Sequence, residues 1–197
     1  KFLKPSHTII SAGSCTTNCV APMIKILNDF FRIKNAYFIT VHAYTATQGL
    51  IDKHDKRDFR RGRSATENIV PTTSGASQSV IESIPELKGK LDGYALRVPV
   101  LNGSISSIIA EVEKKATLNE VNLVFRKSAN KDFKGIIEYT QDSIVSSDII
   151  HNPASCIFDS SITSVNGNVI SIAGWYDNEW GYSNRLVDVA KLILSKK

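Results

Sequence analysis

Two side chains in this sequence could carry out nucleophilic chemistry together. Cys15 lies in the segment Ser14–Cys19, and His42 lies downstream in the segment Val41–Thr45. A cysteine attacks a carbonyl carbon as its thiolate, and a histidine with a pKa of about 6.5 can take up the thiol proton at neutral pH. The two residues therefore predict a thiol nucleophile with a general base.

The residues around Cys15 predict the elements that would activate it. Thr8–Ile10 is apolar and β-branched and predicts a strand, Ala12–Ser14 predicts a tight turn, and the residues after Cys15 predict a helix. Unpaired N–H groups and the positive end of the dipole at a helix N-terminus favour a thiolate. We therefore expect the pKa of Cys15 to lie below its usual value of about 8.5.

The pattern of apolar residues predicts an α+β fold. Strands are expected at 36–42, 96–100, 104–113, 160–165 and 169–175, and helices from 15 to about 31, at 75–84, after 117 and at 184–194. Asn166–Gly167 predicts a hairpin turn, and Pro22 is expected to bend or delimit the first helix. This order favours a mixed, largely antiparallel sheet with helices packed on one face, and it places His42 at the end of a strand.

Length and composition indicate a single domain with a substantial core. The chain has 197 residues, of which 42% are apolar, enough for one large sheet and its helices. Its three cysteines lack the paired spacing of a structural zinc site, and their odd number predicts no disulfide framework. Cys19 and Cys156 are expected to be buried and inert. We therefore expect no metal site and a reducing cytosol.

The charge pattern indicates small-anion binding. The formal net charge is +5, and basic residues gather in the segment Lys53–Arg63, interleaved with aspartates. These acids, and the lack of stacking aromatic residues other than Phe59, favour a loop for small anions over a nucleic-acid surface. No apolar stretch approaches the roughly 20 residues of a membrane span, and Lys1–Pro5 does not open a signal peptide. We therefore expect a cytoplasmic protein that binds neither nucleic acid nor membrane.

The glycines do not form a nucleotide-binding signature. None of the eleven belongs to a G-x-G-x-x-G or P-loop pattern. Any dinucleotide must therefore be bound partly by residues outside this sequence.

Several blocks resemble, in order and spacing, the phosphorylating glyceraldehyde-3-phosphate dehydrogenase family. They are spread over nearly the whole chain and are Ser14–Pro22, His42–Gln48, Asn68–Pro71, Pro85–Leu91, Arg97–Pro99 and Trp175–Arg185. The resemblance implies one catalytic, C-terminal domain over residues 1–197, without the N-terminal Rossmann domain that binds most of the NAD or NADP in this family. It implies that the chain alone has little activity.

The same resemblance implies roles for individual residues. Cys15 is expected to form a hemithioacetal and a thioester, and His42 to act as its base. Asn178 is expected to orient the nicotinamide carboxamide, with Tyr182 near it. The expected phosphate-binding residues are Thr45 and Arg97 for the substrate, and Ser14, Thr16, Ser74, Gly75 and Arg61 for inorganic phosphate.

Two observations refine these expectations. Arg97 lies in an apolar run, where its buried charge would need an anion or an acidic partner whatever the family. Ser74 replaces a threonine common in the family, and Ala12–Gly13 replaces a usual Asn-Ala pair. Neither change removes a catalytic atom, although a glycine loosens the turn before Cys15.

Other functions stay open at this point. Within the family, erythrose-4-phosphate dehydrogenase would release its acyl group to water. A cysteine acyl hydrolase or acyltransferase built on Cys15 and His42 would need neither cofactor nor a second domain, and a non-catalytic assembly module would need neither residue. For the leading function, the resemblance implies glyceraldehyde 3-phosphate and inorganic phosphate as substrates. It also implies a homotetramer formed through the sheet and the segment Tyr44–Glu67.

Overall fold

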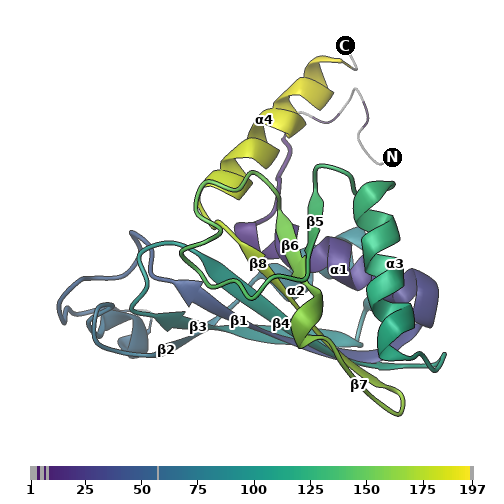
Figure 1. The fold of residues 1–197 in the computed structure, drawn as a ribbon. Helices are drawn as coiled ribbons and strands as arrows, with labels where there is room; N and C mark the ends of the chain where they lie inside the picture. Colours follow the sequence, from purple (N-terminus) through teal and green to yellow (C-terminus); the bar gives the residue numbers. More distant parts are fainter. Residues whose placement is uncertain (1–3, 5–6, 8, 57, 196–197) are drawn as a thin grey trace.

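Four helices are interspersed among groups of strands along the described part of the chain. The computed structural model describes residues 4, 7, 9–56 and 58–195 (Figure 1). The helices are α1 (Cys15–Phe31), α2 (Ala76–Ser83), α3 (Leu118–Asn130) and α4 (Trp180–Leu194). The strands are β1 (Ile33–Ala43), β2 (Val70–Thr73), β3 (Leu91–Val98), β4 (Ser104–Val112), β5 (Ile137–Thr140), β6 (Cys156–Asp159), β7 (Ser164–Asn166) and β8 (Val169–Tyr176).

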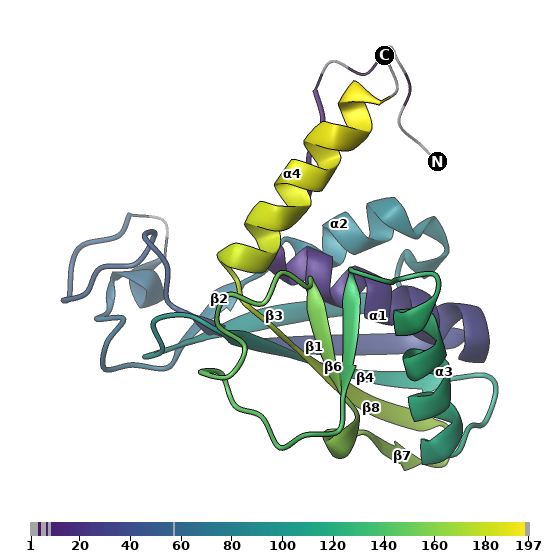
Figure 2. The same cartoon turned by 45° about the horizontal axis from the view of Figure 1, so that its top comes forward.

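The strands form one eight-stranded mixed sheet. Its order is β2-β3-β1-β4-β8-β6-β5, and β7 pairs with β8. The pairs β1–β3 and β5–β6 are parallel, and the remaining pairs are antiparallel. Helices α1, α2 and α3 lie on one face, while α4 extends away from the sheet (Figures 1 and 2). The predicted α+β class, with its largely antiparallel sheet, is confirmed.

Helix α1 is the centre of the core. Its residues Val20, Met23 and Leu27 are fully buried against strand residues such as Phe38 and Ile108. Pro22 lies inside the helix, which continues to Phe31. The apolar contacts between α1 and the sheet fix the position of the helix along the strands. As a result, the first turn of α1 lies beside the ends of the central strands.

Several predicted boundaries are wrong. Ile9 and Ile10 belong to no strand and are exposed, Ile9 at 93%, whereas Thr8 lies outside the described residues. A β-branched run needs a partner strand, and none of the described strands pairs with this one. The last helix begins at Trp180 rather than at residue 184, and the first arm of the predicted hairpin is mostly a 3-10 turn at Ser160–Ile162, with β7 only three residues long.

Other local predictions are confirmed. Thr117 caps α3 in a reciprocal capping box with Glu120. Gly167, with φ 59°, turns the chain between β7 and β8. Among the residues that the structure describes, no helix is both long and apolar enough to cross a membrane.

Candidate active site

A tight turn places Cys15 at the first position of α1. Gly13 has φ +70°, which a glycine adopts at low cost, and a Cβ there would lie 3.0 Å from the Thr17 side chain. Ser14 is the N-cap, and its Oγ accepts a hydrogen bond from the Thr17 N–H at 3.0 Å. Asn18 Nδ2 donates to Ala12 O at 2.9 Å and to Ser14 O at 2.8 Å. Hydrogen bonds from Thr17 and Asn18 therefore fix the turn that precedes Cys15.

The ends of two parallel strands bring His42 and Arg97 together. His42 on β1 is in register with Arg97 on β3, and both strands end one residue later. His42 is 2% exposed. Its Nδ1 lies 2.7 Å from Ala43 O and 2.6 Å from Arg97 Nη1, and Arg97 Nη1 also donates to Ala43 O at 3.0 Å. Arg97 therefore lies directly behind the ring.

The other nitrogen of His42 faces Cys15. His42 Nε2 lies 3.4 Å from Cys15 Sγ, a hydrogen-bond contact for sulfur. Helix α1 contributes the sulfur and strand β1 the ring, so the two side chains meet only because α1 packs across the sheet. The expected pairing of these residues is present.

The charge state of Cys15 differs from the expected thiolate. Burial raises the pKa of its thiol and outweighs the Thr16 N–H group and the Arg97 guanidinium, which lower it. The helix N-terminus acts in the predicted direction, but the loss of water around the sulfur has the larger effect. The prediction of a pKa below the usual value is therefore wrong for this structure.

Burial is also the largest effect on the pKa of His42. Removal from water, followed by the charge of Arg97, lowers the pKa of His42 to about 4, although the bond to Ala43 O raises it. The imidazole is therefore neutral at neutral pH. A neutral imidazole in contact with a neutral thiol has a nitrogen lone pair that can accept the thiol proton when the ring proton is on Nδ1.

A buried hydroxyl network supports the pair from below. Tyr176 OH lies 3.0 Å from Thr16 Oγ1 and 2.6 Å from Thr40 Oγ1, and the Tyr176 ring packs edge-on against His42. Ser106 Oγ donates to Thr40 Oγ1 at 3.0 Å. Burial raises the pKa of Tyr176, so its hydroxyl stays protonated. The network links α1, β1, β4 and β8 beneath the reactive sulfur.

The expected substrate-phosphate residues lie on the β1 and β3 side of the site. Arg97 is half-buried, and no salt bridge to it is present among the described residues. Arg61 is close enough to Arg97 for its charge to lower the Arg97 pKa, although burial has the larger effect. Thr45 lies just past β1, with its Oγ1 3.0 Å from Thr47 Oγ1.

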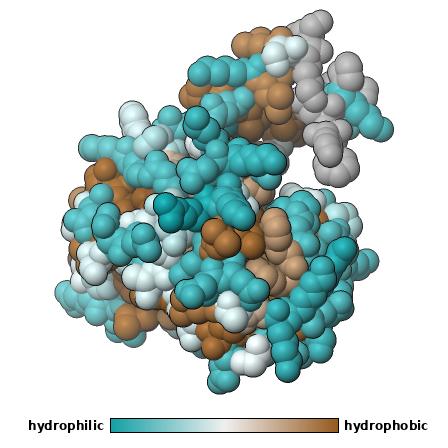
Figure 3. Space-filling model, turned by 45° about the vertical axis from the view of Figure 1, so that its right-hand side comes forward, coloured by the Kyte–Doolittle hydropathy of each residue, from teal (hydrophilic) through white to brown (hydrophobic). Residues whose placement is uncertain are grey.

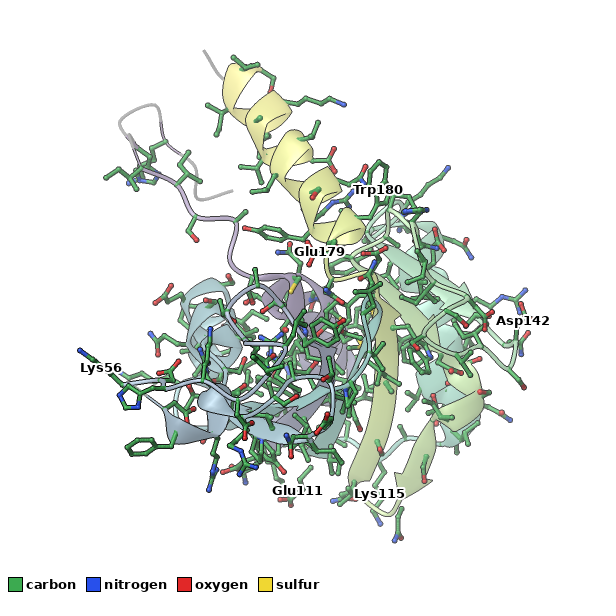
Figure 4. The ribbon with its side chains drawn as sticks, turned by 90° about the vertical axis from the view of Figure 1, so that its left-hand side faces the viewer. Lys56, Glu111, Lys115, Asp142, Glu179 and Trp180 are labelled. Atoms are coloured by element: carbon green, nitrogen blue, oxygen red, sulfur yellow. The ribbon has the colours of Figure 1, made fainter. Side chains whose placement is uncertain are left out.

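A basic hollow adjoins this side. Its volume is about 890 Å³, and Thr47, Lys53, Lys56 and Arg61 are among its lining residues. Lys56 lies on the loop that reaches away from the sheet (Figure 4). Arg61 also forms an ion pair with Asp58 at 3.7 Å. The lining also includes Asp55 and Asp58 but neither Cys15 nor His42, and Arg61 is the lining residue whose charge acts on Arg97.

The expected residues for inorganic phosphate are arranged unevenly. Gly75 is the exposed N-cap of α2 with no side-chain cap, and the N–H groups that follow Ala76 in the first turn are available for an anion. Ser74 Oγ accepts from the Ala76 N–H at 3.2 Å. The hydroxyls of Ser14 and Thr16 are engaged as a helix cap and in the Tyr176 network, and an anion would have to compete for them.

Asn178 and Tyr182 lie where β8 leads into α4. Asn178 is buried, and its Oδ1 accepts from Gly103 N–H at 3.1 Å and from Ser104 Oγ at 2.9 Å. Tyr182 OH donates to Gly13 O at 3.1 Å, which ties the first turn of α4 to the turn before Cys15. Glu179 and Trp180 mark this junction in Figure 4.

Comparison with known proteins decides the family. The family described as glyceraldehyde 3-phosphate dehydrogenase, C-terminal domain, matches residues 14–178. This chain belongs to that family. A glyceraldehyde-3-phosphate dehydrogenase of Streptomyces coelicolor is 53% identical over 195 residues, and the match covers 98% of this chain and 58% of the relative. A relative of the same name from Mycobacterium avium is 50% identical over 188 residues, 95% of this chain and 55% of its own length. The chain thus spans little more than half of these relatives.

The residues that the sequence predicted for the site differ from those that it did not predict in the chemical signal that they carry. Cys15, His42 and Arg97 stand in blocks with an evident chemical signal. Tyr176 and Ser104 carry none, because a tyrosine or serine in a strand is ordinary, yet they contact the expected site residues Thr16 and Asn178. The position of Tyr176 inside the block Trp175–Arg185 was the one available hint.

The remaining cysteines lie in the core. Cys19 and Cys156 are fully buried, as expected. Cys19 Sγ donates to Gly174 O at 3.6 Å, and burial raises its pKa well above the usual value. All three cysteines are free. Within the part of the chain that the structure describes, no cluster of His, Cys, Asp and Glu is arranged to hold a metal.

Proposed function

We propose that this chain is the catalytic domain of a phosphorylating glyceraldehyde-3-phosphate dehydrogenase acting in glycolysis and gluconeogenesis. It would oxidise the aldehyde of glyceraldehyde 3-phosphate and form 1,3-bisphosphoglycerate. The observation that carries the proposal is the 3.4 Å contact between Cys15 Sγ and His42 Nε2 in a member of this family, with Arg97 behind the ring. The pair supplies a nucleophile and a base, and the arginine supplies an anion site.

The first step is attack of Cys15 on the aldehyde carbon. The step uses the tautomer of His42 whose Nδ1 proton is donated to Ala43 O, so that Nε2 carries the lone pair that faces the thiol. In this tautomer Arg97 Nη1 donates to Ala43 O and not to Nδ1. His42 takes the thiol proton as the carbon–sulfur bond forms, and returns it to the oxygen to give a neutral hemithioacetal. The N–H groups at the start of α1 stabilise the charge that develops on that oxygen.

His42 then acts as base in the oxidation. It takes the hydroxyl proton as the hemithioacetal loses hydride from the same carbon, and a thioester on Cys15 remains. When bound, NAD or NADP supplies the acceptor for that hydride. A phosphate oxygen then attacks the thioester carbon, the carbon–sulfur bond breaks, and the sulfur recovers a proton from His42.

Arg97 and Thr45 are proposed to hold the phosphate of the substrate. Arg97 is half-buried, and an anion would compensate its charge. Gly75, Ser74 and Arg61, with Ser14 and Thr16, are proposed to hold inorganic phosphate. Two anion sites on either side of the thioester would keep substrate and attacking phosphate apart while both contact the same carbon.

The chain offers few groups to the cofactor. Asn178 is proposed to orient the carboxamide through Nδ2, and Tyr182 to pack near the ring. The oxygen of Asn178 is already bonded twice, which leaves its Nδ2 as a donor of the kind that a carboxamide oxygen accepts. Residues outside these 197 are proposed to bind most of the dinucleotide. The chain is further proposed to act in the cytoplasm as part of a homotetramer.

The test joins this chain to the part of the Streptomyces coelicolor relative that precedes the matched region. Formation of reduced NAD is followed with glyceraldehyde 3-phosphate, with and without inorganic phosphate, in the fusion and in the chain alone. Activity that needs both phosphate and the added part supports the proposal. Cys15→Ser should abolish it, whereas Cys19→Ser changes the same atom one turn along α1 and should leave the chemical step intact.

Other outcomes would assign a different function. Oxidation of erythrose 4-phosphate without any need for phosphate would indicate the related dehydrogenase that releases its acyl group to water. Turnover of a p-nitrophenyl ester by the chain alone would indicate a cysteine hydrolase. If Cys15→Ser kept its oxidation rate, the assignment of the nucleophile would be overturned.

A further inference from the structure

We infer that Ser104 is a positioning residue for the cofactor site, because its hydroxyl holds the side-chain amide of Asn178 in the one orientation that presents Nδ2. This inference rests on the proposed function of Asn178. Ser104 is the first residue of β4 and is 1% exposed. No chemical signal in the sequence distinguishes it from its neighbours in the strand.

The neighbours of Ser104 allow its hydroxyl only one arrangement of hydrogen bonds. The Ala43 N–H lies 3.1 Å from Ser104 Oγ, and a backbone N–H can only donate. Ser104 Oγ is therefore the acceptor of this bond, and its own proton must go elsewhere. The neighbouring Asn178 Oδ1, at 2.9 Å, takes it.

The orientation of the amide follows from a second donor. The Gly103 N–H lies 3.1 Å from Asn178 Oδ1, and it too can only donate. Two donors therefore face the same atom of Asn178, and that atom must be its oxygen. The Gly103 N–H is shared with Asn102 Oδ1 at 2.8 Å, so the undivided bond to Asn178 comes from Ser104.

The opposite side of the amide remains available. The contact of Asn178 Nδ2 is to Glu179 Oε1 at 3.5 Å, the longest distance that still counts as a hydrogen bond. Glu179 lies at the base of α4 (Figure 4). The amide has two Nδ2 protons and makes this one long contact among the described residues, so the other proton can bind a ligand that reaches this buried side chain.

Ser104 also couples two parts of the site. Its bond to the Ala43 N–H holds the end of β1 directly after His42, and its bond to Asn178 holds the segment directly after β8. In the sheet, Ser104 is in register with Tyr176, two residues before Asn178. The Ser104 hydroxyl therefore links the strand end that follows His42 to the side-chain amide of Asn178.

The first test needs no cofactor. In the chain itself, the side-chain amide of Asn178 should show an order parameter close to that of rigid backbone, about 0.85, by nitrogen relaxation. Ser104→Ala should lower this value clearly, and Ser104→Thr, which keeps the hydroxyl, should restore it. Ser128→Ala removes a buried hydroxyl in α3 and is the matched control. A mobile amide in the wild type, or a rigid one in Ser104→Ala, would overturn the inference.

The second test uses the fusion enzyme and a cycle with Asn178→Ala. Ser104→Ala should raise the KM for NAD by about tenfold, the factor that corresponds to one hydrogen bond of about 1.4 kcal/mol. It should also weaken the preference for NAD over its thionicotinamide analogue, in which sulfur replaces the carboxamide oxygen. In the Asn178→Ala background, Ser104→Ala should change neither value further.

The two tests separate the two ideas. Full additivity in the cycle would show that Ser104 does not act through Asn178 and would overturn the inference. A rigid wild-type amide whose removal by Asn178→Ala leaves the KM for NAD unchanged would instead overturn the proposed role of Asn178, while the contact to Ser104 would stand.

Discussion

The Cys15–His42 pair experiences two opposed electrostatic effects. The start of α1 and Arg97 favour negative charge on the sulfur, whereas burial disfavours charge on both side chains. Burial is the larger effect for each group, and the pair is therefore neutral. In the proposed mechanism one proton moves from this thiol to the imidazole as the sulfur attacks, so the resting site does not have to hold a thiolate.

Because the pKa of His42 is lowered in the fold, the free energy of unfolding should depend on pH. His42 titrates at about 4 in the fold against about 6.5 when unfolded. Above pH 6.5 both states are neutral. As the pH falls toward about 4, the unfolded state binds the proton first, and about 3 kcal/mol of stability should be lost.

Urea unfolding at several pH values measures this effect. His42→Asn should lack this part of the acid loss, while His151→Asn, which changes an exposed histidine, should keep it. Parallel curves for wild type and His42→Asn between pH 6.5 and pH 4 would contradict the lowered pKa.

The alkylation of Cys15 should reflect the same balance. The pH midpoint for its reaction with iodoacetamide should lie above the usual thiol value of about 8.5, because burial raises its pKa. Arg97→Gln should move the midpoint higher still, because the guanidinium lowers this pKa. Arg126→Gln, on α3 and outside the site, is the control. Mass spectrometry of each cysteine gives the rates, and a midpoint that falls in Arg97→Gln would refute the assigned effect.

At the scale of elements, parallel pairing makes the site possible. Because β1 and β3 run in the same direction, their C-terminal ends meet, and His42 and Arg97 become neighbours across 55 positions of sequence. Helix α1 crosses this edge with its N-terminus. Antiparallel pairing of the same two strands would have placed the two residues at opposite ends.

The sequence predicted these elements better than it predicted their pairing. The capping pattern of Thr117 and Glu120 located α3, and the β-branched and aromatic residues of Ala36–His42 located β1, since both signals are local. The strands β2 and β5 have only four residues each, too few for a period to show. The Thr8–Ile10 run had the right composition for a strand, but a strand also needs a neighbour.

The loop before β4 offers a test of local geometry. Gly103 has φ +92°, and a Cβ there would lie 2.6 Å from Ser146 O. Gly135 has φ +78°, but a Cβ there would meet nothing within 4 Å. Gly135→Ala should therefore cost about 1–2 kcal/mol from the backbone alone, and Gly103→Ala about 2 kcal/mol more from the clash.

Urea unfolding of both variants gives the comparison. Equal losses for Gly103→Ala and Gly135→Ala would show that Ser146 moves aside without cost, and that the loop does not hold the Gly103 N–H against Asn178.

At the scale of the whole molecule, two surfaces remain apolar. The sheet face opposite α1 exposes Tyr37 at 58% and Ile109 at 51%, which are cross-strand neighbours of β1 and β4. Helix α4 has Gly181 as its buried residue and exposes apolar side chains such as Leu186 and Val187. Figure 3 shows brown patches on the part of the molecule that projects from its main body. Strand alternation explains the first surface, because every second residue faces away from the core.

The open sheet face gives the prediction for assembly. If the proposed homotetramer forms through the sheet, Ile109→Lys and Tyr37→Lys should shift the chain toward smaller species, because an unpaired charge would be buried at the interface. Sedimentation velocity measures this, with Arg126→Glu on α3 as control. A wild type that is monomeric at all tested concentrations, or lysine variants that assemble unchanged, would refute this interface.

The sequence by itself determined the identity and order of the candidate site residues, the helix start at Cys15 and the class of fold, because each depends on residue type and on neighbours a few positions away. Only the tertiary structure decided which atoms meet: Nε2 with Sγ, Arg97 with Nδ1, Ser104 with Asn178. It also decided the charge of the pair. The effect of burial on a pKa depends on every element packed around the group, and no local pattern in the sequence predicts how many elements will pack there.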